Sequence, residues 1–178
     1  MEDRSEALFP SSYDDEGLEP VVRAVRPGLL LYLNGILHDW AEAEDIAAEA
    51  FLKLLIRQPR FPSESALRAW LYKVGRNLAF NFLRKQKNLV IEEELADRDD
   101  ASRSDAEEIL LAREERQELY DALEKLSPDY REILWLDAEG LPHAAIVEIT
   151  KKSRRQVENI LYRGRILLRE MMQNYREV

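Results

Sequence analysis

The chain has 178 residues, no cysteine and a net charge of −9 at neutral pH. This length suits one or two small domains, and the lack of cysteine excludes a disulfide framework and a thiolate metal site. The two histidines, His38 and His143, lie far apart in the sequence without ligand spacing, so no metal or cofactor site is expected.

The excess negative charge is confined to one segment. Residues 88–126 hold 5 basic and 14 acidic groups, whereas residues 1–87 hold 12 and 13 and residues 127–178 hold 9 and 8. Because salt screens charge over about 8–10 Å, a phosphate group responds to the local charge and not to the total. The acidic balance therefore does not exclude nucleic acid as a partner.

Two features of the sequence indicate a cytoplasmic protein. The apolar run from Leu29 to Leu33 is far shorter than the roughly twenty residues that a membrane-spanning helix needs. The chain starts with Met-Glu-Asp, which lacks the basic and apolar design of a secretion signal.

The N-terminal part begins with an acidic leader. Residues 1–17 contain Pro10 and the run Asp14-Asp15-Glu16, a composition typical of a disordered segment. From residue 18 to residue 37 the apolar residues follow helical spacing. Pro27 falls inside this pattern, so the sequence predicts one broken helix or two short ones.

Residues 39–57 form the next predicted helix. Its expected core stripe consists of Ile46, Ala50, Phe51, Leu54 and Leu55. Its acidic residues crowd the first half and are Asp39, Glu42, Glu44, Asp45 and Glu49. This gradient complements the helix dipole, which alone accounts for much of the pattern. The same acidic groups also suit a docking face for a basic partner.

A loop with Pro59 and Pro62 separates this helix from a long basic helix that is predicted over residues 66–87. The apolar residues expected on one side of the long helix are Leu67, Trp70, Leu71, Val74, Leu78 and Phe82. A second stripe consists of Lys73, Asn77, Phe80, Arg84 and Lys87. Basic groups beside an aromatic ring and an amide suit a nucleic-acid backbone and an unpaired base. Trp70 and Phe82 themselves are expected in the core.

The middle of the chain has the composition of a flexible acidic linker over residues 88–105, and a helical pattern resumes over residues 106–126. The sequence contains no glycine-rich phosphate loop, nucleophile elbow or Cys/His cluster, so an enzyme is not expected. These patterns predict an all-α fold with two small helical domains, residues 18–87 and 106–178, joined by the linker.

The C-terminal part contains start and stop signals for three helices. Ser127 and Pro128 give an N-cap and a proline at the first helical position, Gly140 ends that helix, and Pro142 opens the second. Ser153 and Gln156 have the spacing of a capping box at the start of the third helix. Two short helices joined by a tight turn, the second rich in arginine at its start, predict a helix-turn-helix.

The third of these helices has two faces. Its inner face consists of Val157, Ile160, Leu161, Leu168 and Met171. These residues are expected to be buried against Ile133, Leu134, Ile146 and Ile149. Its outer face consists of Arg154, Arg155, Gln156, Asn159 and Arg163. In a helix-turn-helix the first residues of the second helix enter the major groove, where arginine pairs with guanine and asparagine or glutamine with adenine. The alternative is that these are solvated residues on an ordinary surface helix.

Two sequence blocks together resemble bacterial sigma factors of the extracytoplasmic-function (ECF) group in the sigma-70 family. The first block comprises AEAEDIAAEAFLKLL and ALRAWLYKVGRNLAFNFLRKQK, and the second comprises LSPDYREILWLDAEGLPHAAIVEI and SRRQVENILYRGRILLRE. The resemblance covers residues 18–173 in the order of the family. It implies a region 2 domain and a region 4 domain that bind core RNA polymerase and direct promoter recognition, DNA melting and transcription initiation.

The resemblance also implies roles for individual residues. The acidic helix from Asp39 to Glu49 matches the docking surface for the polymerase clamp helices. The residues that match the minus-ten DNA contacts are Phe61, Ser63, Ser65, Lys73, Arg76, Asn77 and Arg84. Those that match the minus-thirty-five contacts are Lys151, Lys152, Arg154, Arg155, Gln156, Asn159 and Arg163. Lys151 and Lys152 stand in a turn where family members usually have a glycine and an apolar residue.

The expected partners are core RNA polymerase, promoter DNA, and an anti-sigma factor or another regulatory protein. Two other classes of function stay open: a sigma-like decoy that sequesters an anti-sigma factor, and a helix-turn-helix regulator that never contacts polymerase. The presence of both the acidic helix and the basic stripe disfavours the decoy. The lack of an evident dimerisation heptad disfavours a conventional repressor, which would bind two half-sites as a dimer.

Overall fold

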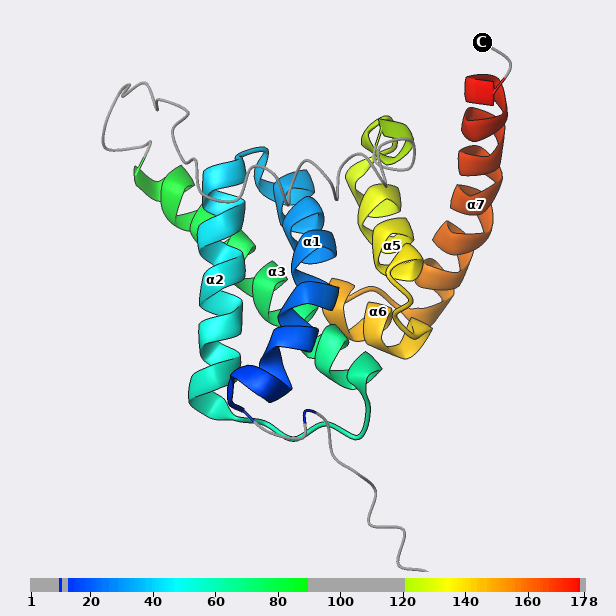
Figure 1. Cartoon of the computed structure of the whole chain (residues 1–178). Helices are drawn as coiled ribbons and strands as arrows, with labels where there is room; N and C mark the ends of the chain where they lie inside the picture. Colours follow the sequence, from blue (N-terminus) through cyan, green and yellow to red (C-terminus); the bar gives the residue numbers. More distant parts are fainter. Residues whose placement is uncertain (1–9, 11–12, 90–120, 177–178) are drawn as a thin grey trace, which may run out of the picture. The chain divides into compact units, whose positions relative to one another are not determined.

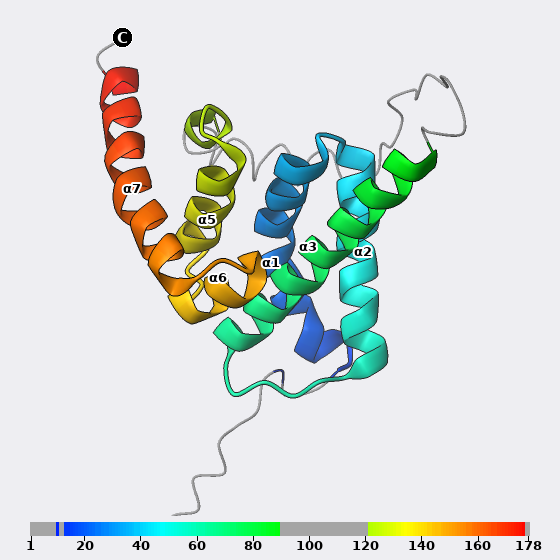
Figure 2. The ribbon, with the colours of Figure 1, turned by 180° about the vertical axis from the view of Figure 1, so that it is seen from behind.

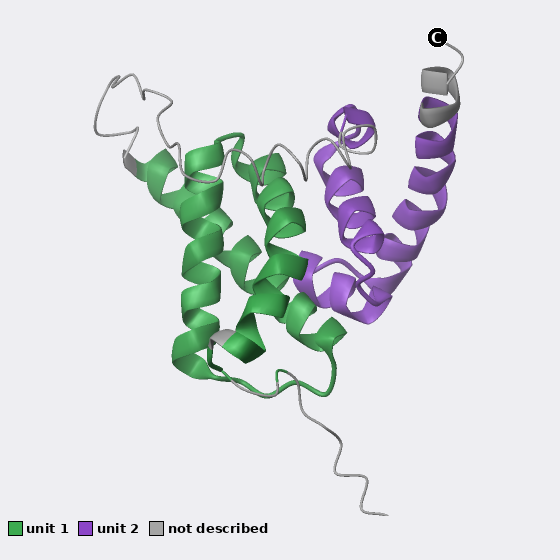
Figure 3. Ribbon diagram, viewed as in Figure 1, with its two compact units in different colours: residues 1–104 green, residues 105–178 purple. Residues whose placement is uncertain are grey.

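The computed structural model describes residues 10, 13–89 and 121–176, and its regular elements over these ranges are all α-helices (Figure 1). The helices are α1 (Asp15–Leu37), α2 (Trp40–Arg57), α3 (Glu64–Leu89), α5 (Pro128–Ala138), α6 (His143–Thr150) and α7 (Arg154–Arg176). The chain divides into two compact units, Met1–Ser104 and Asp105–Val178 (Figure 3). The expected all-α fold with two helical domains is therefore confirmed. Most of the predicted linker and of the helix before residue 121 lies outside the described residues.

The first helix starts inside the predicted leader. Asp14 is its N-cap and accepts a hydrogen bond from the backbone N–H of Gly17 at 3.0 Å, so residues 15–17 are helical. Just before it, the carbonyl oxygen of Pro10 accepts a hydrogen bond from Arg60 Nη1 at 2.8 Å. The rest of the predicted leader, residues 1–9 and 11–12, lies outside the described residues.

The predicted break at Pro27 does not divide α1. The helix continues through both Pro20 and Pro27, and its ribbon bends along its length (Figure 1). A proline inside a helix costs about 3 kcal/mol, because it removes one hydrogen bond and crowds the preceding turn. Val25 and Leu29, on either side of Pro27, are completely buried. Their burial offsets a cost of this size, since each buried side chain contributes about 1.5–3 kcal/mol.

Helices α1, α2 and α3 pack against one another to form the core of the N-terminal unit, and α3 crosses the other two diagonally (Figure 2). The largest fully buried side chain is Tyr72 of α3, whose ring meets that of Tyr32 of α1 edge to face with centroids 5.2 Å apart. Gly75 lets α3 approach α1, because a Cβ atom there would lie 3.2 Å from Leu29 Cδ1. The sequence did not single out Tyr72, which anchors α3 and so fixes the outward direction of its basic residues.

In the C-terminal unit, α5, α6 and α7 enclose a second core. The residues predicted to bury the inner face of α7 are indeed buried: Ile133, Leu134, Ile146 and Ile149. From α7 itself, Val157 and Leu161 are buried, whereas Ile160, Leu168 and Met171 are half-buried. Arg165 of α7 joins α5 through a bidentate ion pair with Asp137, with N–O distances of 2.9–3.2 Å. The three predicted helices and their order are therefore confirmed.

Helices α5 and α7 approach each other closely at Gly164 of α7. A Cβ atom at this position would lie 2.6 Å from Leu134 Cδ1 and 3.0 Å from Leu134 Cγ. Leu134 is only 2% exposed, so it has little room to move away. A larger side chain at position 164 must therefore push α7 away from α5.

We predict that Gly164→Ala destabilises the C-terminal unit by about 1–2 kcal/mol. Overpacking of about 1–3 kcal/mol outweighs the gain of up to about 1 kcal/mol in helix propensity. Urea unfolding followed by the fluorescence of Trp135, in a chain with Trp40→Phe and Trp70→Phe so that no other tryptophan emits, measures the change. In a Leu134→Ala background the added methyl group fills space, so the cost should disappear there. An equal cost in both backgrounds would contradict the packing argument.

Candidate nucleic-acid and protein interfaces

The acidic residues in the first half of α2 differ in their exposure and in their structural roles. Asp39 is the N-cap and accepts a hydrogen bond from the backbone N–H of Glu42 at 3.2 Å, so it has a structural role. Glu42 and Glu44 are half-buried. Asp45 and Glu49 are exposed, and Glu49 forms an ion pair of 3.0 Å with Lys53. The carboxylates that point outward are therefore those of Asp45 and Glu49.

The second half of α2 carries an exposed apolar surface that the sequence interpretation missed. Leu52 is 52% exposed and Ile56 is 73% exposed. Leu55, which was predicted to lie in the core, is 44% exposed, so that prediction is wrong. The buried face of α2 is made by Ala43, Ile46, Ala47, Ala50 and Leu54. The run from Phe51 to Ile56 has five apolar residues in six positions, more than one helix face can bury, and this excess was the available signal.

Asp45, Glu49, Leu52 and Ile56 follow one another at spacings of three and four residues and therefore share one exposed side of the helix. We refer to these four residues as the α2 outer stripe. The stripe is acidic toward its N-terminal end and apolar toward its C-terminal end. Such a surface combines charge that attracts a basic partner with apolar area that the partner can bury.

An apolar groove lies between α1 and α2. It has a volume of about 430 Å³ and is lined by Leu18, Glu19, Val22, Phe51, Leu54 and Leu55. Leu55 thus faces a hollow rather than a packed neighbour, which explains its exposure. A groove of this kind accepts apolar side chains from another protein.

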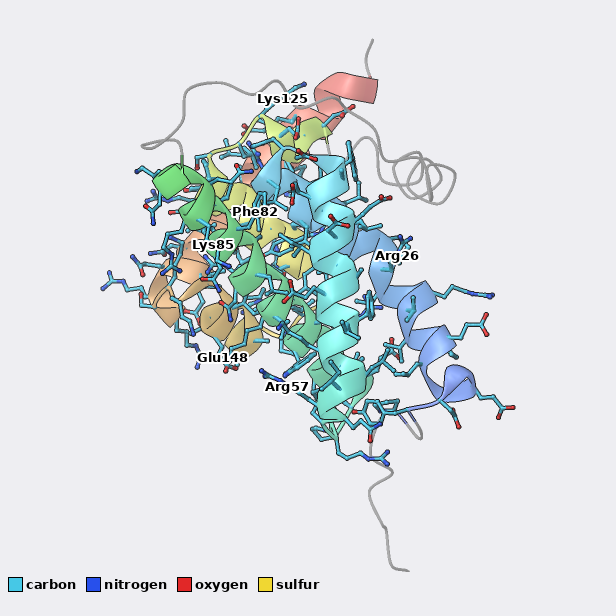
Figure 4. The ribbon with its side chains drawn as sticks, turned by 90° about the vertical axis from the view of Figure 1, so that its left-hand side faces the viewer. Arg26, Arg57, Phe82, Lys85, Lys125 and Glu148 are labelled. Atoms are coloured by element: carbon cyan, nitrogen blue, oxygen red, sulfur yellow. The ribbon has the colours of Figure 1, made fainter. Side chains whose placement is uncertain are left out.

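A second groove, of about 440 Å³, lies between α2 and α3 and has walls of opposite charge. The α2 wall contributes Glu42, Asp45, Ile46 and Glu49, and the α3 wall contributes Leu78, Asn81, Phe82, Arg84, Lys85 and Asn88. Figure 4 shows Phe82 and Lys85 on α3 beside α2. Phe82 is half-buried here, so it forms part of the groove wall as well as of the core.

The loop before α3 is held in place by residues that were predicted to contact DNA. Phe61 is 7% exposed, and its ring packs against that of the half-buried Trp70 with centroids 6.0 Å apart. Ser63 Oγ accepts a hydrogen bond from the backbone N–H of Ala66 at 3.2 Å, and α3 begins at Glu64. The helix therefore starts two residues before the predicted position, and it includes the half-buried Ser65. Phe61 and Ser63 shape the loop.

The basic side of α3 runs along most of its length. Asn77, Phe80 and Arg84 are exposed, while Lys73 and Arg76 are half-buried. The guanidinium carbon of Arg76 lies 4.5 Å from the centroid of the Phe80 ring, a cation–π contact. Arg84 Nη2 donates a hydrogen bond to Asn81 Oδ1 at 2.7 Å. The structure thus brings the predicted α3 residues onto one helix with a charged and aromatic surface.

The turn between α6 and α7 is formed despite its unusual sequence. Lys151 has a φ of 61°, in the left-handed region, and its N–H donates to the carbonyl oxygen of Val147 at 3.0 Å. A residue with a Cβ atom pays about 1 kcal/mol for this conformation, which explains why glycine suits the position. The next residue, Lys152, forms an ion pair of 2.7 Å with Asp129 in the first turn of α5.

The start of α7 contains the predicted capping box. The backbone N–H of Ser153 donates to Gln156 Oε1 at 2.9 Å, and the backbone N–H of Gln156 donates to Ser153 Oγ at 3.3 Å. At the N-cap of α5, in contrast, Ser127 occupies the predicted position, but its side chain accepts no capping hydrogen bond. The capping role leaves Gln156 with its amide N–H groups for other contacts.

The basic residues of α7 differ in their local pairing. Arg154 Nε donates to Glu158 Oε1 at 2.7 Å, and this hydrogen bond raises the pKa of Arg154. Arg155, Asn159 and Arg163 are exposed, and we find no side-chain hydrogen bond or ion pair between them and any residue that the structure describes. Lys151 is also exposed, and its side chain likewise has no such partner among the described residues. The predicted minus-thirty-five residues therefore divide into a group with intramolecular partners and a group that points to solvent.

Among the described residues, no helix is both long and apolar enough to cross a membrane. No group of three or more His, Cys, Asp or Glu side chains among them could hold a metal ion.

Comparison with known families matches both units. The model of Sigma-70 region 2 matches residues 21–89, and the model of Sigma-70 region 4 matches residues 116–168. The two matches together cover more than half of the chain, and they coincide with the helices that carry the surfaces described above. Both matched regions occur in the order that the sequence resemblance implied.

Individual relatives agree with this result. The RNA polymerase sigma factor YlaC of Bacillus subtilis is 27% identical, over 91% of this chain and 95% of its own length. The ECF RNA polymerase sigma factor SigX of Bacillus subtilis is 24% identical, over 84% of this chain and 80% of its own length. The probable RNA polymerase sigma factor RfaY of Xanthomonas campestris is 34% identical, but this chain spans only 40% of its length.

A solved structure shows the same fold. The sigma factor RpoE of Bartonella quintana, crystallised with the anti-sigma factor NepR, superimposes with a TM-score of 0.61 at 22% identity. The match covers 90% of this chain and 98% of that one. With regions 2 and 4 both present in order, the chain belongs to the sigma-70 family and to its ECF group of RNA polymerase sigma factors.

Proposed function

We propose that this chain binds core RNA polymerase in the cytoplasm and directs it to the promoters of a specific regulon, where it takes part in DNA melting and transcription initiation. The presence of regions 2 and 4 in one chain carries this proposal. No catalytic role is proposed for the chain itself. In vitro transcription with core polymerase and a library of genomic fragments tests the function. Transcripts that start at defined sites only when the chain is added support it, whereas a decoy or a conventional repressor would produce none.

A regulatory protein such as an anti-sigma factor is a further proposed partner. The relative RpoE was crystallised with an anti-sigma factor, and the apolar groove between α1 and α2 offers a surface that an apolar helix or strand could cover. The groove is compatible with reversible masking of the N-terminal unit.

The α2 outer stripe is the proposed docking surface for polymerase. Its carboxylates attract a basic partner over a distance, and Leu52 and Ile56 supply apolar area that is buried on contact. Asp39 caps the N-terminus of the helix, and the half-buried Glu42 and Glu44 add negative charge beside the stripe. Charge and apolar contact are therefore expected to contribute separately to affinity.

We predict that Asp45→Lys with Glu49→Lys weakens binding to core polymerase about tenfold and makes the remaining affinity less sensitive to salt. Leu52→Ser with Ile56→Ser should also weaken binding but leave the salt dependence unchanged, because no charge is altered. Fluorescence anisotropy of labelled chain against core polymerase over a salt series measures both quantities. Glu124→Lys with Glu170→Lys, two exposed positions in the other unit, controls for net charge. Unchanged affinity in both α2 variants would contradict the docking assignment.

The basic side of α3 and the loop before it are the proposed surface for the minus-ten DNA. Lys73, Arg76 and Arg84 supply positive charge for the backbone, and Asn77 and Phe80 lie among them on the same helix. Melting requires an extruded base to be held while the separated strand is neutralised. The exposed Asn77 amide can hydrogen-bond such a base, and Phe61 and Ser63 contribute by fixing the loop.

We predict that Asn77→Ala with Lys73→Ala slows opening of a duplex promoter about tenfold, while a pre-melted template is used nearly normally. The reason is that the lost contacts stabilise the separated strand and are unnecessary once the strands are apart. Permanganate reactivity of unpaired thymines with equal amounts of assembled holoenzyme measures opening. Arg57→Ala removes one positive charge from α2 and serves as the control. Equal losses on both templates would indicate general strand binding instead.

The helix-turn-helix is the proposed reader of the minus-thirty-five element. Arg155, Asn159 and Arg163 are exposed on α7 and are proposed to reach base edges, while Lys151 lies in the turn before the helix. Gln156 is proposed to contribute mainly through the capping box. Base contacts and phosphate contacts affect binding differently, which makes the two roles separable.

We predict that Arg155→Ala loses about 1–3 kcal/mol on the preferred upstream sequence and discriminates less at one base pair. Lys151→Gly should weaken all sequences alike and lower the salt slope by about 0.9, because one phosphate contact is lost. Glycine also adopts the positive φ of this turn without steric cost, so misfolding cannot explain the loss. Electrophoretic mobility shifts with holoenzyme measure both effects. Footprints without upstream protection would contradict the assignment.

A further inference from the structure

Two cations beside the proposed DNA-reading residues are already neutralised by carboxylates of the same unit. Lys152 Nζ lies 2.7 Å from Asp129 Oδ2, and Arg154 Nε lies 2.7 Å from Glu158 Oε1. Both distances are those of charge-assisted hydrogen bonds. Arg155, the neighbour of Arg154, has no such partner among the described residues. Of these neighbouring cations, Lys152 and Arg154 are therefore paired with carboxylates and Arg155 is not.

The two carboxylates come from different places. Asp129 lies in the first turn of α5, 23 residues before Lys152, so this pair connects the turn to another helix. Glu158 lies one helical turn after Arg154 on α7. The side chains of Asp129 and Glu158 are 59% and 48% exposed, so solvent and competing anions can reach both pairs. A DNA phosphate could replace either carboxylate.

Such ion pairs affect the charge that the surface presents to DNA more than they affect the stability of the fold. A cation next to a carboxylate presents almost no net charge beyond the screening length of about 8–10 Å, and a phosphate that approaches it also meets the negative carboxylate. Exposed ion pairs, however, add little to stability. The salt-dependent, sequence-independent part of DNA affinity grows with the number of cations that release counterions from phosphates. Two cations that are already paired with carboxylates therefore supply two phosphate contacts fewer.

We propose that Asp129 and Glu158 are intramolecular competitors of DNA phosphate that hold Lys152 and Arg154 and so weaken the binding of this unit to DNA of any sequence. Arg155, Asn159 and Arg163 then carry a larger share of the binding, and the absolute affinity for non-specific DNA falls. The inference rests on the proposed role of α7 in reading the minus-thirty-five element. It assigns to two acidic residues the function of limiting sequence-independent DNA binding.

The test replaces each carboxylate by its amide. Holoenzyme with Asp129→Asn or Glu158→Gln is compared with the unaltered holoenzyme on a promoter fragment from the transcription assay and on the same fragment with a scrambled upstream element. Each variant should bind both fragments about fivefold more tightly at 0.15 M salt, with a salt slope steeper by about 0.9, because one cation gains a phosphate contact. Discrimination between matched and scrambled fragments should not improve. Glu170→Gln, an exposed position on the same helix, controls for the loss of one negative charge.

Second substitutions identify the cation involved. The gain from Asp129→Asn should disappear in a Lys152→Ala background, and the gain from Glu158→Gln should disappear in an Arg154→Ala background. Thermal unfolding of each single variant, monitored by circular dichroism, should stay near that of the unaltered chain. Gains that persist without the partner cation, or that equal the gain from Glu170→Gln, overturn the proposal.

Arg155→Ala separates failure of this inference from failure of the proposed function. If Arg155→Ala weakens matched binding but the two amide variants behave like Glu170→Gln, the competitor role is wrong and α7 still reads DNA. If Arg155→Ala has no effect on either fragment, α7 does not contact the upstream DNA, and both the reader role and the competitor role are overturned.

Discussion

Burial of one face of each helix determines which of its polar residues face outward, and the proposed surfaces depend on this constraint. In α2, burial of Ala43, Ala50 and Leu54 turns Asp45, Glu49, Leu52 and Ile56 toward solvent. In α7, burial of Val157 and Leu161 and the close approach of Gly164 to Leu134 fix the rotation of the helix. Arg155, Asn159 and Arg163 then point away from the core. A helix can present a chosen set of charges only because its opposite side is packed tightly enough to prevent rotation.

Local signals in the sequence were sufficient to predict the helices and much of the C-terminal unit. Ser153 and Gln156 form the predicted capping box because both members of that motif lie within one turn. Long-range effects were harder to predict. Pro27 does not break α1 because burial of the residues around it depends on two other helices, and Leu55 is exposed because a groove lies where the helical pattern suggested a core. The same limit applies to the site: Phe61 matches a minus-ten contact of the family, but its burial against Trp70 of α3 is a tertiary contact that no local signal predicted.

Electrostatic behaviour follows the pairing of charges more than their number. The net charge of −9 resides largely in residues 88–126, and each flanking part is close to neutral. Within those parts, Lys152 and Arg154 are offset by carboxylates, whereas α3 carries several cations and a single acidic residue, Glu64, which lies 3.6 Å from Arg68. Between α2 and α3 the two signs face each other across a groove. Local potential, which governs contact with phosphate, is therefore set by geometry that composition does not reveal.

Weak individual surfaces are an advantage for a factor that must act only together with polymerase. Two units on one chain gain affinity through effective concentration once one of them is docked, so neither needs to bind DNA strongly alone. A strongly basic helix-turn-helix would instead occupy the large excess of non-specific sites in a genome. In the proposed roles, the paired cations Lys152 and Arg154 reduce that loss, and Arg155, Asn159 and Arg163 remain to distinguish sequences. The unusual turn of this chain thus fits the proposed division of roles, in which polymerase supplies most of the affinity and α7 supplies the discrimination between sequences.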